Sequence, residues 1–169
     1  IQDNCELTYS DDSVHYFNDT ILCFSPPFFH GPEDVRLGFV IMTTVTDQTT
    51  TLVHASDVQG PVTKDATEYI INQKPDIVIM DGPPTLFLGW RFSKKNLKDA
   101  TDNLIRIIKQ TNCDIILDHH LLRDVHYRNR FAEPYKRYPN KIKSFAEYQG
   151  KENLMLEAQR KTIWQQEHK

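Results

Sequence analysis

Hydrophobic residues along the chain form short runs that stop at prolines, glycines or charged residues. Three of these runs, residues 51–56, 77–80 and 115–117, are rich in β-branched and long aliphatic side chains, and a polar group follows each of them. Runs of this length, separated by helical patterns, are typical of buried strands in a layered sheet. The pattern predicts an α/β domain with at least three buried strands.

Other runs predict the remaining elements. Strands are expected over residues 14–17, 20–24 and 37–45, and the last of these should pair as a hairpin with residues 49–56 across Asp47-Gln48. Helices are expected after Thr63, after Ser93 and over 153–167, where apolar residues repeat at helical spacing. The last helix should bury these side chains: Leu154, Met155, Ala158, Thr162 and Ile163.

Polar groups follow three of the buried strands. Asp57 comes after the first, Asp81 after the second, and Asp118-His119-His120 after the third. Alternation of helices and strands favours parallel neighbours, and ligands bind at the carboxyl ends of parallel strands. We therefore expect these side chains at one edge of the sheet.

Imidazole and carboxylate groups are the donors that zinc, iron and manganese prefer in proteins. His30, in the expected loop 28–32, together with Asp57 and one of His119 or His120, would supply half of a two-metal site. Each signal is weak alone, because a loop histidine is usually a surface residue and an aspartate can stabilise a turn. His54 lies inside its strand and should point away from Asp57, so it is interpreted as structural.

Composition and length limit the number of domains, the partners and the cellular location of the protein. The 169 residues suit one domain, and a net charge of −3 does not call for a nucleic-acid or membrane partner. No apolar run approaches the roughly 20 residues of a membrane span, and no signal peptide is recognisable. Three scattered cysteines, Cys5, Cys23 and Cys113, do not form a disulfide framework. A cytoplasmic location is expected.

Several motifs together resemble a known fold. They are His54-Ala-Ser-Asp-Val-Gln-Gly-Pro61, Asp81-Gly-Pro-Pro-Thr85, Arg91-Phe-Ser-Lys-Lys95 and Asp118-His-His-Leu-Leu-Arg-Asp124. In this order they resemble the C-terminal half of a metallo-β-lactamase-fold protein, closest to an uncharacterised metallo-β-lactamase-like hydrolase family best known in archaea. The resemblance implies half of a four-layer αββα sandwich, with a mixed sheet and flanking helices.

The resemblance also implies roles for individual residues. His30, Asp57 and His119 would be metal ligands, with His120 in place of His119 if the register differs by one. Asp57 would bridge two zinc ions, with manganese or iron as alternatives. Asp57, His120 and Asp81 would be the catalytic residues of a hydrolase that uses a metal-bound hydroxide on an ester or phosphodiester.

One departure from that fold is large. Its His-x-His-x-Asp-His motif is absent, and the chain begins with Ile1 rather than methionine. We expect residues 1–169 to be a single domain that forms the C-terminal half of a longer fold. The N-terminal half would be a second chain or segment, with self-association as an alternative, and the isolated chain would bind zinc poorly.

Two other functions stay open. Asp118-His119-His120 matches the name-giving motif of the manganese-dependent Asp-His-His phosphoesterases, although their companion aspartate motifs are not recognisable here. The stretches 91–95 and 123–138 interleave cations with aromatic residues, as RNA-binding surfaces do. Solvated loops that support the core are the simpler interpretation of these two stretches.

Overall fold

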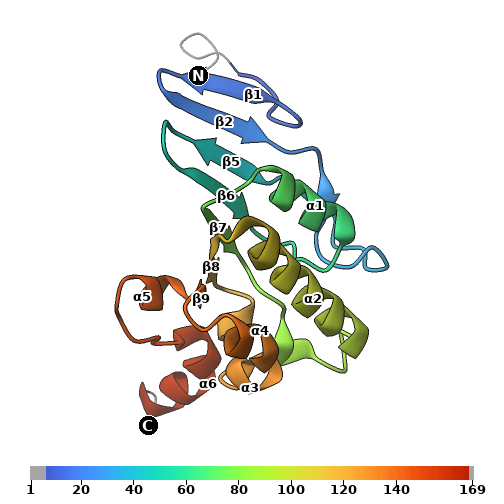
Figure 1. The fold of residues 1–169 in the computed structure, drawn as a ribbon. Helices are drawn as coiled ribbons and strands as arrows, with labels where there is room; N and C mark the ends of the chain where they lie inside the picture. The colour runs from blue at the N-terminus through green and yellow to red at the C-terminus, as the bar shows by residue number, and fades with distance from the viewer. Residues whose placement is uncertain (1–6, 168–169) are drawn as a thin grey trace.

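A computed structural model of the protein describes residues 7–167 and contains a seven-stranded mixed sheet in the order β1-β2-β5-β6-β7-β8-β9 (Figure 1). Ile1 and Cys5 lie outside the described residues. A separate two-stranded sheet pairs β3 (Phe28–Phe29) with β4 (Phe39–Val40). The strands of the main sheet are β1 (Val14–Phe17), β2 (Thr20–Phe24), β5 (Thr43–Thr46), β6 (Thr51–Ala55), β7 (Ile77–Met80), β8 (Asp114–Leu117) and β9 (Ile142–Lys143).

The main sheet has an antiparallel half and a parallel half. Strands β1, β2, β5 and β6 pair antiparallel, whereas β6, β7, β8 and β9 run parallel. Ala55, Met80 and Leu117, the last residues of β6, β7 and β8, lie side by side in register. The three neighbouring strands therefore end side by side at the same edge of the sheet.

Two helices, α1 (Lys64–Asn72) and α2 (Lys94–Thr111), pack side by side against one face of the sheet (Figure 1). The main core forms between them and the strands, where Val53, Val78 and Ile115 stand in register and are almost fully buried. The Ser93 hydroxyl caps α2 by accepting a hydrogen bond from the Asn96 N–H at 3.0 Å. The expectation of an α/β domain with a mixed sheet and flanking helices is confirmed.

No helix within residues 7–167 combines the length and the apolar character that crossing a bilayer requires.

Shorter elements follow the central strands. The short elements are the 3-10 helices η2 (Thr85–Phe87) and η3 (Leu121–Arg123), the helices α3 (Tyr127–Arg130), α4 (Ala132–Arg137) and α5 (Phe145–Tyr148), and the terminal helix α6 (Leu156–Glu167).

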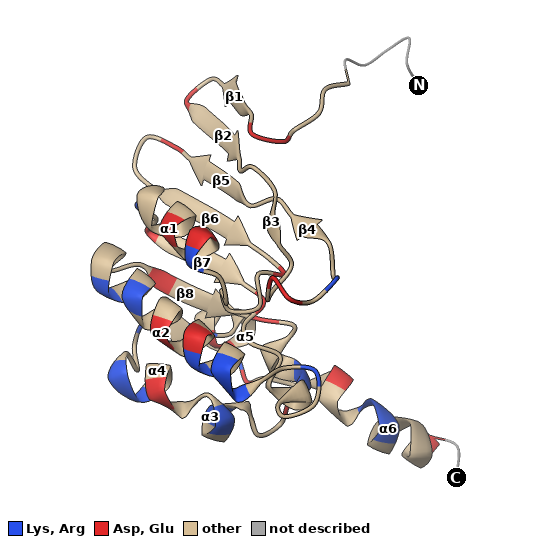
Figure 2. Cartoon of the chain, turned by 90° about the vertical axis from the view of Figure 1, so that its right-hand side faces the viewer, with Lys and Arg blue, Asp and Glu red and all other residues tan. Residues whose placement is uncertain are grey.

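Two expected elements differ from the structure. The run 37–45 is not one strand, because the Met42 N–H donates to the Ser25 hydroxyl at 2.8 Å and separates β4 from β5. The hairpin of β5 with β6 is present as expected. The expected burial of the last helix is wrong for α6, which contains no buried residue, and for Leu154, which is 72% exposed. Figure 2 shows the reason, since α6 extends away from the sheet. Met155, just before α6, is partly buried against the main core.

Candidate metal centre

The candidate site lies at the level edge where β6, β7 and β8 end. Asp57 follows β6 by two residues, Asp81 follows β7 directly, and His119 and His120 follow β8 by two and three residues. Parallel pairing in register thus collects side chains that are far apart in the sequence. The expected convergence of these groups at one edge is what the structure shows.

A tight turn presents Asp57. Its backbone φ is 63°, in the left-handed region that aspartate tolerates better than most residues, and Gln59 has φ 55°. Gly60 (φ 114°) permits a close approach to α2, because a Cβ there would lie 3.0 Å from the Ala100 Cβ. The Ser56 hydroxyl donates to Asp57 Oδ2 at 3.0 Å, which leaves Oδ1 facing the histidines.

His30 reaches the site from the segment between β3 and β4. Its backbone N–H donates to the Gly38 carbonyl at 3.0 Å, which closes this segment into a loop. The next residue, Gly31 (φ 81°), packs so tightly on the Gln59 side chain that a Cβ there would lie 2.5 Å from it. These contacts place His30 Nε2 at 3.6 Å from Asp57 Oδ1.

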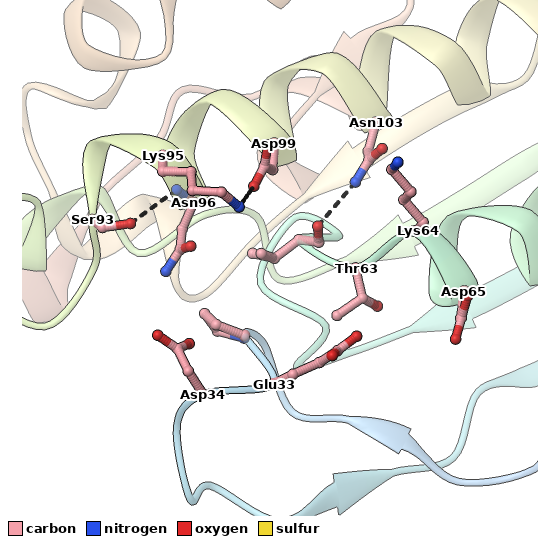
Figure 3. Close-up of a pocket in the computed structure, with 12 residues that line it drawn as sticks. Glu33, Asp34, Thr63, Lys64, Asp65, Ser93, Lys95, Asn96, Asp99 and Asn103 are labelled. Carbon is pink, nitrogen blue, oxygen red and sulfur yellow. Dashed lines mark hydrogen bonds and ion pairs between the residues drawn. The ribbon is translucent and has the colours of Figure 1, made fainter.

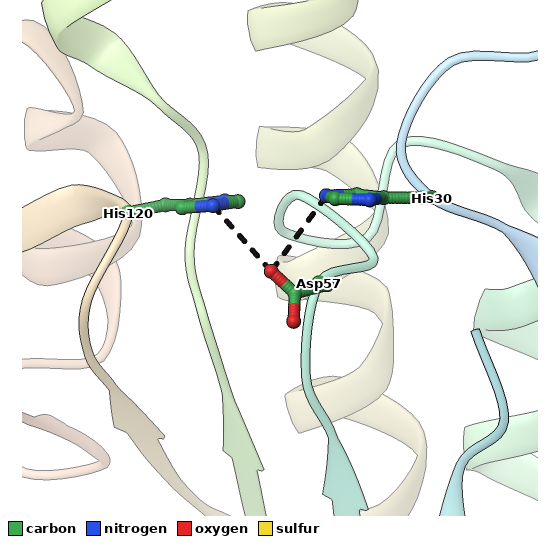
Figure 4. A group of neighbouring side chains, drawn as sticks. All are labelled: His30, Asp57 and His120. Atoms are coloured by element: carbon green, nitrogen blue, oxygen red, sulfur yellow. Dashed lines mark ion pairs between the residues drawn. The ribbon is translucent and has the colours of Figure 1, made fainter. Parts of the chain in front are cut away.

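Two more imidazoles contact the same carboxylate oxygen. His119 Nε2 lies 3.2 Å and His120 Nε2 lies 3.4 Å from Asp57 Oδ1. Figure 4 shows the rings of His30 and His120 on either side of the Asp57 carboxylate; they are nearly parallel, at 8°, with centroids 6.0 Å apart. Ligand atoms of His30, Asp57 and His120 all lie within 4.8 Å of one another.

Asp81 stands behind His120 and is fully buried. Its Oδ2 accepts a hydrogen bond from the Gln59 N–H at 2.8 Å and lies 2.8 Å from His120 Nδ1. The second contact is close enough for an ion pair but is not an aligned hydrogen bond. One carboxylate oxygen therefore contacts both the turn that carries Asp57 and the ring of His120.

The two carboxylates differ in their electrostatics. Burial raises the pKa of Asp57, but its contacts with His119 and Ser56 outweigh burial, so that its pKa lies below the ordinary value. Complete burial raises the pKa of Asp81, and the contacts with His120 and Gln59 oppose this rise only in part. Asp57 is thus ionised at neutral pH and can attract a cation.

The three-residue group fits a divalent metal ion. His30 Nε2 is buried without a hydrogen-bond partner and faces a carboxylate. A metal-binding imidazole has this environment when its metal is absent. Two imidazoles and one carboxylate with an open position are the donor set of catalytic zinc sites. Within residues 7–167 this is the group with suitable spacing, and it contains His120 instead of the expected His119. Their roles remain predictions.

A hollow of about 540 Å³ opens beside the group. Sequence reasoning missed most of its walls, because they come from loops whose spacing follows no period. Its lining residues are His30, Pro32, Val35, Leu37, Gln59, Pro84, Phe87, Arg91 and His120.

A larger hollow of about 720 Å³ lies elsewhere, where the first turns of α1 and α2 face the loop at Glu33 and Asp34 (Figure 3). Lysines and carboxylates both line it, and Lys95 pairs there with Asp99 at 2.7 Å. Its lining contains more carboxylates than lysines, and it does not include the histidines. The smaller hollow is therefore the one relevant to the candidate site.

Two arginines of the segment with interleaved cations and aromatic residues contact other residues of the fold. Arg128 pairs with Glu147 and lies 4.4 Å from the ring centroid of Tyr135. Arg130 Nη1 donates to Asp124 Oδ2 at 2.9 Å. These arginines satisfy internal partners, which agrees with the simpler interpretation of residues 123–138 as support for the core.

Comparison with known proteins gives a relationship at the level of sequence. The chain matches no protein-family model. It is similar to UPF0282 proteins of archaea. The identity is 46% with the UPF0282 protein of Methanopyrus kandleri, over 92% of this chain and 52% of the relative. It is 41% with that of Methanocaldococcus jannaschii and 40% with that of Pyrococcus furiosus, over 95% and 94% of this chain and 52% and 49% of the relatives.

These relatives correct one expectation. They carry the name UPF0282, and nothing among them names a metallo-β-lactamase-fold protein, so the assignment to that family was wrong. Short motifs around strand ends are shared by unrelated α/β proteins, because the edge of a parallel sheet favours the same residue types wherever it binds ligands. The chain spans about half the length of the curated relatives it matches.

Proposed function

We propose that the protein is a metal-dependent hydrolase whose ion is held by His30, Asp57 and His120 and whose substrate is an ester or phosphodiester. The observation that supports this most is the contact of three imidazoles with a single oxygen of Asp57, at 3.2 to 3.6 Å. Such an arrangement is unfavourable for folding alone, since an imidazole nitrogen is left buried without a partner. A bound cation would satisfy it.

The donor set indicates which ions fit. Nitrogen donors with one carboxylate suit zinc, and manganese or iron are alternatives. A bound divalent ion lowers the pKa of water, so that water can act as a nucleophile near neutral pH. Three protein ligands leave coordination positions for water and substrate.

Residues around the ion would have separate roles. Asp57 would neutralise the cation, since its lowered pKa keeps it ionised. Asp81 would orient His120, because its contact with Nδ1 turns Nε2 toward Asp57. His119 lies outside the three-ligand group, and 40% of its side chain is exposed. We assign to His119 the transfer of a proton to or from the substrate.

Zinc titration of matched variants tests the proposal. Asp57→Ala and His30→Ala should each weaken zinc binding by more than the roughly 10–100-fold seen when a residue behind a ligand is changed. His54→Ala is the control. His54 lies in β6, the strand that leads to Asp57, but it is exposed and outside the three-residue group. Equal losses in all three variants, or none, would contradict the assignment.

The substrate class needs its own assay. The metal-loaded protein should hydrolyse p-nitrophenyl acetate or bis-p-nitrophenyl phosphate, and His119→Gln should lower the rate while leaving zinc affinity nearly unchanged. Activity confined to manganese and short oligonucleotides would favour the Asp-His-His phosphoesterase alternative instead. Hydrolysis of neither ester by the loaded protein would count against the enzyme assignment.

We also infer that the sheet carries a further layer in the complete protein. Side chains alternate between the two faces of a strand, and the face opposite Val53 and Val78 is apolar but only half-buried. The relatives are about twice as long as this chain, which supports a covering segment. The residues of this open face are Leu22, Phe24, Val45, Leu52, Ile77 and Ile79.

A further inference from the structure

The hollow beside the metal group has two unlike sides. His30 and His120 form one side, so a molecule bound there would touch the proposed metal site. Val35 and Leu37, from the loop between β3 and β4, and Phe87 from η2 form the other side. A volume of about 540 Å³ is within the range of small-molecule sites.

Arg91 gives this hollow its charge. No carboxylate lines the hollow, and the Arg91 guanidinium has no ion-pair or hydrogen-bond partner among residues 7–167. Its guanidinium lies 4.2 Å from the ring centroid of Trp90, which restricts where it can move. Arg128 and Arg130, in contrast, are paired with acids. Arg91 is therefore an exposed cation beside an apolar wall, with its guanidinium available to a ligand.

The chemistry of the walls limits the ligand. A nucleic acid would need several phosphate contacts, whereas one arginine lines the hollow. A single guanidinium matches a single carboxylate, which it can bind through two parallel hydrogen bonds. The apolar side matches a hydrocarbon or aromatic body. Both features belong to a small organic acid.

We propose that the hollow binds an apolar carboxylate, whose acid group pairs with Arg91 while its body lies along Leu37 and Phe87. That the bound acid is a substrate rests on the proposed function. The ester to be cleaved would then belong to a molecule that carries a separate carboxylate. Arg91 would then determine specificity and would take no part in bond cleavage.

Binding measured without metal separates this proposal from the proposed function. In EDTA at pH 8, a carboxylate cannot be captured by a bound ion. The probes are 4-phenylbutyrate and 4-phenylbutyramide, which have the same hydrocarbon body and differ in charge. Binding of each probe is measured by titration in nitrogen–proton correlation spectra of the protein. The acid should bind about tenfold more tightly than the amide. Amide signals of Gln59 and Arg91, both in the lining, should shift on binding.

Three variants define the outcome. Arg91→Gln should abolish the preference for the acid, and Arg36→Gln, an exposed arginine of the same region outside the lining, should keep it. Leu37→Ala should weaken both probes equally. Equal binding of acid and amide to the unmodified chain, a preference that survives Arg91→Gln, or no binding at all would overturn the proposal. If the preference holds but no ester is cleaved, the hydrolase assignment alone fails.

Discussion

Replacement of Asp81 tests whether the buried carboxylate serves the metal group or only the fold. Asp81→Asn keeps an oxygen for the Gln59 N–H, so the turn that carries Asp57 should persist. The same oxygen lies 2.8 Å from His120 Nδ1, and as a neutral amide oxygen it would no longer form an ion pair with that ring. The ring would hold its nitrogen toward Asp57 less firmly and would be a less basic ligand.

The expected magnitude follows from how much of this support each variant removes. Changes behind a metal-binding histidine typically cost about 10–100-fold in metal affinity. Asp81→Asn, which keeps the shape and one acceptor, should lie near tenfold, equivalent to about 1.4 kcal/mol. Asp81→Ala removes both contacts and should lie near the upper end, about 2.7 kcal/mol.

Competition between the protein and a chromophoric zinc chelator measures these affinities. Asp118→Asn is the matched control: Asp118 follows β8 at the same edge and precedes His119, yet it is outside the three-ligand group. Denaturant unfolding of the metal-free variants should accompany the titration, to show that each is folded. If Asp118→Asn costs as much affinity as Asp81→Asn, or if Asp81→Asn costs none, the argument that Asp81 orients His120 is refuted.

Three other predictions concern the fold. Asp124→Ala should lower the free energy of unfolding by about 2–4 kcal/mol in urea denaturation, since it leaves Arg130 without its buried acceptor. Hydrogen bonds from backbone N–H groups lower the pKa of Asp47, so the stability gap between the unmodified chain and Asp47→Asn should persist at neutral pH and disappear in acid, as melting curves would show. Val45→Thr with Ile79→Thr, on the open face, should reduce self-association in light scattering.

Much of the site could be predicted because parallel strands convert sequence pattern into position. Three apolar runs followed by polar residues predicted that Asp57, Asp81 and the histidine pair would meet, and the level strand ends bring them together. His30 was predicted from its residue type, its expected loop and the family resemblance, and no strand pattern pointed to it. Its placement depends on the packing of Gly31 against Gln59, a contact between loops that has no sequence period.

Other features depend on contacts that a pattern does not encode. Helical spacing identified α6, but spacing shows which residues share a face and not whether anything covers that face. The choice between His119 and His120 was similarly open. It depends on how the chain turns after β8, where the Leu121 N–H donates to the Asp81 carbonyl at 3.2 Å and begins η3 at that point.

The contacts of Asp81 connect these observations. Its carbonyl holds the turn after β8, and its carboxylate holds both the turn after β6 and the ring of His120. A fully buried carboxylate with a raised pKa is costly to maintain, and an apolar residue would serve the core at lower cost. Its presence is understandable if the two turns must be held in a fixed relation, since that relation sets the separation of Asp57 and His120. The most buried carboxyl group in the site is therefore better explained by ligand placement than by stability.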